Sequence, residues 1–391
     1  MQLKRLCLLL LTLAPVVQGA YDAEDTLKLN AELAYRYDDN VFRLAENANN
    51  TVTKRHGTQA DSNLLAAIGG RIDVPVSRQT FYALGNVSRQ QYFKFDELNH
   101  TAWTAGLGWD WQAGSQFFGN LSANTSSSMS SFDEVSPDVI DMVRQEGVSW
   151  SGNWLLSKNW LLVADTAYRR EDHDERQFED ARSLTYGLGL RYVTDKGSSI
   201  TLRHQWQDYD YLKNIGIIPA DLRGYKEQSL SLAFLWPVTQ QLQVQASGGY
   251  SRWKPNFGGQ KSSSTPQGDL TVTWQATGKT RLSAGIGQNF DQFNSGAGRD
   301  LDRTAFIGAN WAMSDKVRWD TEYRYRQRET KTTLGLLLRD ELYDSVSLSL
   351  VFEAMRNLSL KPFAKYEQRN DQIGKADYKD TQFGLSGRYD F

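Results

Sequence analysis

Side chains along this chain alternate between apolar and polar with a period of two residues, in segment after segment. Clear examples are TAWTAGLGWDWQ at 101–112, SLTYGLGLRY at 183–192 and VRWDTEYRYRQR at 317–328. Because successive side chains of a β-strand point to opposite faces, each segment has one apolar, aromatic-rich face and one polar face. After residue 20 no apolar run approaches the roughly 20 residues that a membrane-spanning helix needs. Sustained alternation of this kind is typical of a transmembrane β-barrel.

The spacing of these segments predicts about 18 strands. They are expected near residues 26–37, 59–74, 79–95, 101–112, 115–125, 143–155, 159–170, 182–193, 198–211, 225–236, 240–252, 266–277, 279–291, 300–313, 316–329, 338–352, 357–369 and 379–391. Alternate connections are tight, such as AGS at 113–115 and TGK at 277–279, and the intervening ones are mostly longer, such as 38–58 and 126–142. We therefore predict an all-β fold, a closed antiparallel transmembrane β-barrel with short periplasmic turns and longer extracellular loops.

The segment MQLKRLCLLLLTLAPVVQGA at residues 1–20 has two basic residues, then a short apolar stretch, then small residues. This layout predicts a secretory signal peptide at 1–20 and a barrel formed by 21–391, in the outer membrane of a Gram-negative bacterium. The one cysteine of the sequence, Cys7, falls in the signal segment, so no disulfide framework is expected. A net charge of −2 argues against a nucleic-acid partner.

The sequence ends with TQFGLSGRYDF at 381–391, and Phe391 is in phase with the apolar face of that segment. Closing a barrel requires the last strand to pair with the first, which removes both sheet edges. We expect Phe391 on the lipid-facing side of this closure, at the periplasmic rim. The GRYDF ending resembles the aromatic signal that the outer-membrane insertion machinery reads. A soluble β-sandwich or β-helix ending in Phe is the alternative, but it does not account for the alternation of short and long connections.

If the apolar faces meet lipid, the polar faces line a lumen. Charges of both signs point inward by this alternation, with a modest basic excess in the last four strands. The lumen-lining candidates are Arg318, Asp320, Glu322, Arg324, Arg326, Arg328, Lys361, Lys365, Arg369 and Arg388. An ion-selective filter would show rings of one sign, so we interpret most of these charges as solvated or paired across strands. The Ser, Asn, Gln and Gly residues between them favour a neutral polar solute at least as well as an ion.

No catalytic residue, metal site or cofactor is predicted. The sequence contains no Gly-x-Ser-x-Gly elbow, no His-Glu-x-x-His motif and no Ca²⁺ loop. Of the four histidines, His56 and His100 fall in loops and His204 faces lipid. His173 lies in REDHDERQFED at 170–180, which could bind a cation or surface sugars but is expected to be a solvated surface loop. We therefore expect a non-enzyme, with a barrel enzyme built from scattered residues as a less favoured alternative.

The segment YRYDDNVFRL, from Tyr35 to Leu44, follows the first predicted strand. It resembles the start of the EpsL-like family of exopolysaccharide-biosynthesis outer-membrane β-barrels, which are porin-like proteins encoded with polysaccharide systems. The resemblance implies a passive role in exporting or assembling a surface polysaccharide, with its export apparatus as partner and the lipid bilayer as environment. A general diffusion porin is the alternative. Asp38, Asp39 and Asn40 are also good turn formers, which alone explains their place at a strand end.

Overall fold

The computed structural model describes residues 26–46, 48–132, 140–216, 219–256, 262–292, 298–332, 336–374 and 377–391. The predicted signal peptide at 1–20 lies outside these residues. The strands are β1 (Leu27–Asp38), β2 (Asp61–Val76), β3 (Gln79–Tyr92), β4 (His100–Ala113), β5 (Phe117–Met129), β6 (Met142–Ser157), β7 (Trp160–His173), β8 (Ala181–Val193), β9 (Ser199–Tyr211), β10 (Tyr225–Pro237), β11 (Leu242–Pro255), β12 (Ser263–Gln275), β13 (Thr280–Gln292), β14 (Gly298–Ala312), β15 (Val317–Thr332), β16 (Leu337–Met355), β17 (Leu358–Asp371) and β18 (Tyr378–Asp390). Short helical segments are α2 (Thr51–His56), η1 (Asp96–Leu98), η2 (Gln177–Glu179) and α3 (Ala220–Arg223).

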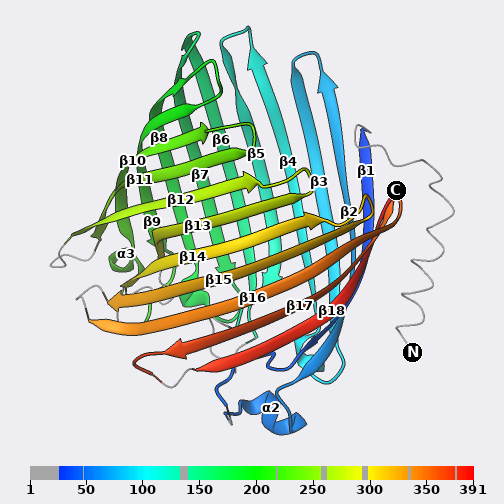
Figure 1. Ribbon diagram of the computed structural model, residues 1–391. Helices are drawn as coiled ribbons and strands as arrows, with labels where there is room; N and C mark the ends of the chain where they lie inside the picture. Colours follow the sequence, from blue (N-terminus) through cyan, green and yellow to red (C-terminus); the bar gives the residue numbers. More distant parts are fainter. Residues whose placement is uncertain are drawn as a thin grey trace.

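The 18 strands formed by the described residues make one sheet that curls into a closed barrel (Figure 1). Every strand pairs antiparallel with its neighbours in sequence, and β1 pairs with β18 to close the ring. The predicted fold class is confirmed, and each predicted strand corresponds to one observed strand. The largest difference in bounds is at the end of β5, predicted at 125 and observed at Met129. None of the helices in the described part of the chain is long and apolar enough to cross a membrane.

The connections alternate in length around the barrel. Tight turns join β6 to β7 and β8 to β9, and they gather at the upper rim in Figure 1, on the side where the chain ends. At some of these turns the backbone enters the left-handed region, as at Gly114 (φ 64°) and Gly197 (φ 81°), where a residue without Cβ avoids a steric penalty. The longer connections lie at the opposite rim and carry α2 and η1. In outer-membrane barrels the short-turn rim is periplasmic and the long-loop rim is extracellular.

The outer surface of the barrel is apolar. Large hydrophobic side chains stand exposed along one face of the strands, including Leu107 at 65% and Ile286 at 61% of their maximal exposure. Aromatic pairs flank this surface near the strand ends, with Phe117 stacked on Trp154 at 5.5 Å between ring centroids. Soluble monomers rarely expose so large a contiguous apolar patch, so this face meets the lipid.

The seam between β1 and β18 is aligned over nine residue pairs, from Asn30 opposite Asp390 to Asp38 opposite Gln382. At its periplasmic end the Phe391 amide donates a hydrogen bond to the Leu29 carbonyl at 2.9 Å, and the Phe391 ring contacts Tyr389. Phe391 therefore lies at the closing seam, and its role in barrel assembly stays a prediction.

Candidate functional site

The strands near the C-terminus form a charged wall on the inner face of the barrel. On β15 the outward side chains Trp319 and Tyr323 are exposed, so the even-numbered residues between and beyond them face inward. The same reasoning on β17 and β18, from outward Tyr366 and Tyr389, turns the lumen-lining candidates of those strands inward. The alternation of faces in the structure thus matches the predicted positions. Whether these residues line a conducting lumen stays a prediction.

Most of these charges are paired along a single strand. Arg318 lies 3.2 Å from Asp320, Arg324 lies 2.9 Å from Glu322, Lys365 lies 2.6 Å from Glu367 and Arg388 lies 2.9 Å from Asp390. Of the two expected states, solvated or paired across strands, these residues keep partial exposure to solvent, but their ion pairs run along one strand and not across strands. Residues two apart on a strand share a face, so one strand can neutralise its own charges. Each pair is partly exposed and contributes little to stability, but together they lower the net charge of the wall.

Three of the remaining candidates, Arg326, Arg328 and Arg369, contact side chains on neighbouring strands. Arg328, 6% exposed, bonds Asp302 on β14 at 3.2 Å and lies 3.7 Å from Asp300. The Arg326 guanidinium lies 4.1 Å above the Tyr343 ring, in a cation–π contact. On β17, Arg369 lies 3.6 Å from Glu341 on the neighbouring strand.

Lys361 is exposed on the inward face of β17.

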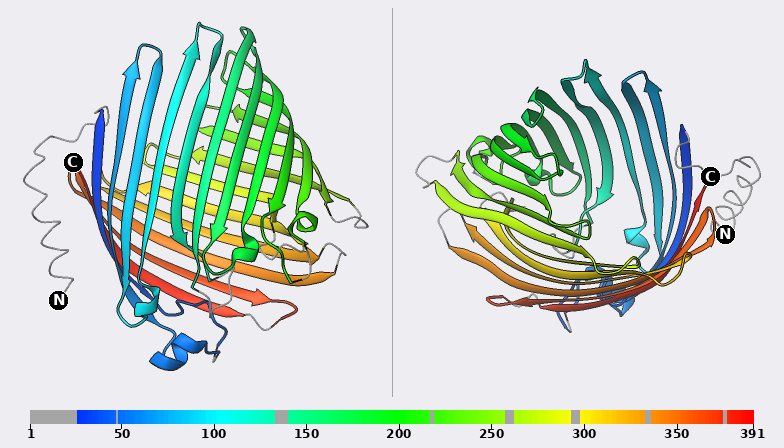
Figure 2. Two further views of the ribbon diagram at one scale, coloured as in Figure 1. Left: turned by 180° about the vertical axis from the view of Figure 1, so that it is seen from behind. Right: turned by 45° about the horizontal axis from the view of Figure 1, so that its top comes forward.

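Strands β4, β5 and β6 form a neutral wall. Most of their inward polar side chains are hydroxyls and amides, and the carboxylate among them, Asp110, accepts a hydrogen bond from Asn120 at 2.7 Å. The hydroxyls and amides are Thr104, Gln112, Asn120, Ser122, Asn124, Ser126, Gln145, Ser149, Ser151 and Asn153. They bond to one another across strands, as in the 2.8 Å contact between the Ser122 and Ser149 hydroxyls. In the closed ring β5 is nine strands from β14 in either direction, so the neutral wall lies across the lumen from β13–β15, and β15 is the strand of the charged wall that it faces (Figure 2).

The loop after β1 turns inward at the extracellular rim. Arg43, in the left-handed region at φ 55°, lies 3.3 Å from Asp38, 3.2 Å from Asp380 on β18 and 4.0 Å from Glu367 on β17. We call Asp38, Arg43, Glu367 and Asp380 the rim cluster. Asp38, Asp39 and Asp380 are close enough to hold a cation, but the Arg43 guanidinium already fills that role for two of them.

The turn itself is built by Asn40. Its side-chain amide donates to the Leu44 carbonyl at 2.8 Å and to the Lys379 carbonyl at 3.0 Å, and its oxygen accepts from the Leu44 amide. This accounts physically for the YRYDDNVFRL segment: its polar residues end β1 and fold the loop onto β17 and β18. A pocket of about 550 Å³ lies beside this turn, lined by residues that include Asn40, Gln59, Arg369 and Tyr378.

Three consecutive extracellular loops share a small apolar core. It consists of Val41, Phe42, Leu44, Val52, Phe95, Leu98 and Phe132, all buried. Phe42 packs on Phe95 and Phe132 at centroid distances of 5.3 and 4.7 Å, which joins the loops after β1, β3 and β5. We call this assembly the loop cap. The helix α2 of the cap lies beyond the ends of the strands (Figure 1).

A second polar cluster lies where the loop after β5 meets the loop after β7. His173 is 6% exposed and Asp141 is 1% exposed, so the expectation of a solvated loop is wrong for the centre of this segment. The His173 ring bonds Asp141 through Nδ1 at 2.7 Å and Glu171 through Nε2 at 3.0 Å. Arg176 bonds Asp141 at 3.1 Å and Glu179 at 2.5 Å.

These contacts shift the protonation of the cluster, which lies beyond Tyr168, the last exposed aromatic of β7, and so outside the membrane. Burial alone opposes the charge of Asp141, but hydrogen bonds from His173, the Glu175 amide and Ser130 lower the pKa of Asp141 to about 2. Burial also opposes the charge of His173, yet its two carboxylate partners raise the pKa of the imidazole. Burial raises the pKa of Glu179 to about 7.

The cluster is not arranged for nucleophilic catalysis. Ser130 donates its hydroxyl to Asp141 at 2.8 Å and not to His173, whereas an activated serine must bond to its base. Both ring nitrogens of His173 face carboxylates, which favours a charged imidazolium held in ion pairs. We interpret the cluster as the structural anchor of these loops. A buried ion network of this kind leaves no mark in the sequence, because its members look like ordinary surface residues.

Residues 234–391 match a family model described as "Putative beta-barrel porin 2". No curated protein sequence matches the chain. Solved structures with a similar fold include OpdK of Pseudomonas aeruginosa, crystallised with vanillate (9% identity, TM-score 0.51, 93% of this chain and 99% of that one). They also include OccAB4 of Acinetobacter baumannii (12%, 0.52, 94% and 99%).

A further similar structure is the copper transporter OprC (10% identity, TM-score 0.52, 94% of this chain). The chain spans 65% of the length of that protein. At these identities the likeness concerns the fold alone. Together with the closed 18-stranded ring of the described residues and its apolar outer face, it makes this chain a porin-like β-barrel of the outer membrane of a Gram-negative bacterium.

Proposed function

We propose that this barrel is a passive, non-enzymatic conduit for hydrophilic solutes, and that its cargo is a surface polysaccharide. The observation that carries the proposal is the combination of a largely neutral wall on β4–β6 with a charged wall on β15, β17 and β18 whose charges are largely neutralised along their own strands. A sugar exchanges hydrogen bonds with hydroxyl and amide side chains as it moves. An ion filter needs uncompensated charge of one sign, and neither wall presents a ring of such charges.

The proposal that the cargo is a polysaccharide rests in addition on the resemblance of residues 35–44 to the EpsL-like family. The sequence contains no P-loop or other nucleotide motif. The polymer would therefore be driven by an export apparatus elsewhere in the envelope, and the barrel would supply the path across the outer membrane. The insertion machinery of the outer membrane is a further expected partner, through the C-terminal aromatic.

Conductance across planar bilayers tests the conduit. The purified barrel should form channels with weak ion selectivity, and neutral oligosaccharides should block them. Ser149→Lys adds an uncompensated charge to the neutral wall, so it should shift the reversal potential toward anions and weaken the block. Ser314→Lys, in the exposed turn between β14 and β15, is the matched control and should change neither. Absence of channels from folded barrel would overturn the conduit.

A deletion strain tests the cargo. Loss or shortening of the surface polysaccharide in that strain would support export. A normal amount and chain length, together with intact conductance of the purified barrel, would leave a general diffusion porin as the function. That second candidate is favoured by the several inward charges that the walls retain, such as Lys361.

A further inference from the structure

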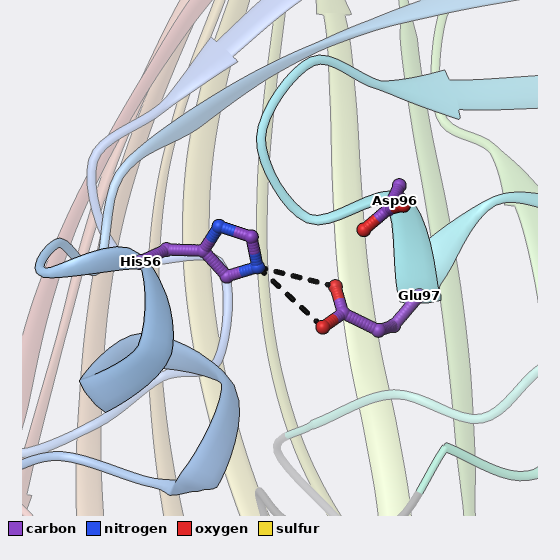
Figure 3. Close-up of side chains that lie close together, drawn as sticks. All are labelled: His56, Asp96 and Glu97. Atoms are coloured by element: carbon purple, nitrogen blue, oxygen red, sulfur yellow. Dashed lines mark hydrogen bonds and ion pairs between the residues drawn. The ribbon is translucent and has the colours of Figure 1, made fainter.

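Three potential metal ligands meet on the outer surface of the loop cap (Figure 3). His56 is the last residue of α2 in the loop after β1, and Asp96 and Glu97 lie in η1 in the loop after β3. One ligand atom from each side chain lies within 4.8 Å of the other two. His56 Nε2 is 3.4 Å from each carboxylate oxygen of Glu97.

The backbone under these residues is fixed before any ligand arrives. Asn50 and Thr53 form a capping box at the start of α2, and Gly57 ends the helix in the left-handed region at φ 67°. The His56 ring stands edge-on to Phe95 at 5.4 Å. Phe95 itself is fully buried, and its amide bonds the Asp61 carboxylate at 2.8 Å. Little ordering remains to be done on binding, which favours affinity.

The donor set selects a class of ion. One imidazole nitrogen with two carboxylates suits Zn²⁺ and similar divalent transition ions, whereas Ca²⁺ and Mg²⁺ take oxygen ligands. With metal–ligand bonds of about 2.1 Å, two ligands of a tetrahedral ion stand about 3.4 Å apart. The His56–Glu97 separation already has this value.

A second observation points the same way. The Oε2 atom of Glu97 is buried and accepts no hydrogen bond from the described residues, although it lies 3.4 Å from His56 Nε2. A buried carboxylate oxygen that accepts no hydrogen bond is costly, and a cation between it and His56 would satisfy it. The other oxygen, Oε1, lies 2.5 Å from Arg55, whose side chain is 62% exposed and so can swing into water.

We propose that His56, Asp96 and Glu97 form an extracellular site for a Zn²⁺-like ion, with water completing the coordination. The ion would cross-link the loops after β1 and β3 and so rigidify the loop cap at the extracellular rim. Arg55 competes with the ion for Glu97, which gives the proposal a distinctive consequence: removing this arginine should tighten metal binding.

The experiment titrates ZnCl₂ into purified, untagged barrel in detergent, by calorimetry and by competition with a chromophoric chelator. We expect one equivalent to bind, with affinity at least about tenfold weaker in His56→Ala and in Glu97→Gln. Arg55→Ala should bind several-fold more tightly. His100→Ala is the matched control, because the His100 ring bonds the Leu98 carbonyl near the cluster but is not part of it, and it should bind like the wild type.

A spectroscopic readout separates a metal site from a simple ion-pair network. Co²⁺ should give the absorption of a four-coordinate N/O site in the wild type and in Arg55→Ala, and not in His56→Ala. Heat-modifiable migration on gels verifies that each variant is folded. Equal Zn²⁺ affinity in folded wild type, His56→Ala and Glu97→Gln would overturn the proposal, and so would weaker binding in Arg55→Ala.

Discussion

Leu188 lies at the centre of the lipid-facing surface, and arginine there should destabilise the barrel strongly. The side chain is 49% exposed on the outer face of β8. Outward Leu184 and Tyr192 lie four residues to either side, which is about 10 Å of depth each way at a rise of about 3.3 Å per residue and a strand tilt of about 40°. This places Leu188 near the middle of an apolar band about 25 Å tall, where Leu188→Arg should lower the free energy of unfolding by roughly 2–4 kcal/mol.

The control must be an inward residue of the same strand that tolerates a side chain. Gly189 does not qualify, because a Cβ there would stand 2.7 Å from the Leu202 carbonyl oxygen and 3.0 Å from Val163. Thr185 is inward and half-buried, and Thr185→Arg should cost about 1 kcal/mol or less.

Denaturant unfolding in phospholipid vesicles, followed by tryptophan fluorescence, measures both changes. An equal loss of stability at the two positions would refute the assignment of the faces.

Three further predictions follow from the rims and loops. In intact cells an impermeant maleimide should label Lys213→Cys and spare Lys279→Cys; the reverse pattern would invert the barrel. Deleting Phe391 removes a seam hydrogen bond and should reduce heat-modifiable, membrane-inserted protein, so normal insertion would contradict its role. The low pKa of Asp141 stabilises the folded loops above pH 3.8 and is lost toward pH 2, whereas the raised pKa of His173 stabilises them below pH 6.5 and is lost as pH rises through its folded value. The protection of residues 173–180 from hydrogen exchange, relative to the intrinsic rate at each pH, should therefore be greatest between these limits. Because Asp141 and His173 are bonded to each other, Asp141→Asn and His173→Gln should each flatten the pH dependence on both sides, and an unchanged profile in either variant would contradict the prediction.

The strands and their faces are predictable because alternation of apolar and polar residues with a period of two indicates both that a segment is a strand and which of its side chains face lipid. The ion pairs on the inner face could also have been predicted from the sequence. The segments RWD at 318–320, KYE at 365–367 and RYD at 388–390 put opposite charges two residues apart on one face of a strand. Solvated charges or pairs across strands were expected instead, because the register of neighbouring strands is not readable from single segments.

The loop contacts could not be predicted in the same way. His56 and Glu97 are 41 residues apart in sequence, and Asp141 and His173 are 32 apart. Each becomes a neighbour only because the barrel brings consecutive hairpins side by side. Polar residues in a loop predict solvent exposure, whereas their burial here arises from neighbouring loops packing together, which no local sequence pattern indicates.

The two ends of the closing seam are fastened unequally, and this bears on how the wall opens sideways. Arg43 follows β1 yet holds Asp380 on β18, and the Thr381 amide bonds the Asp39 carboxylate at 2.7 Å. Beyond the paired residues at the other end, the Phe391 amide bond fastens the seam. We therefore expect fraying of the β1–β18 seam to start at the periplasmic end, so that lateral opening of the barrel wall requires less energy there than at the extracellular rim.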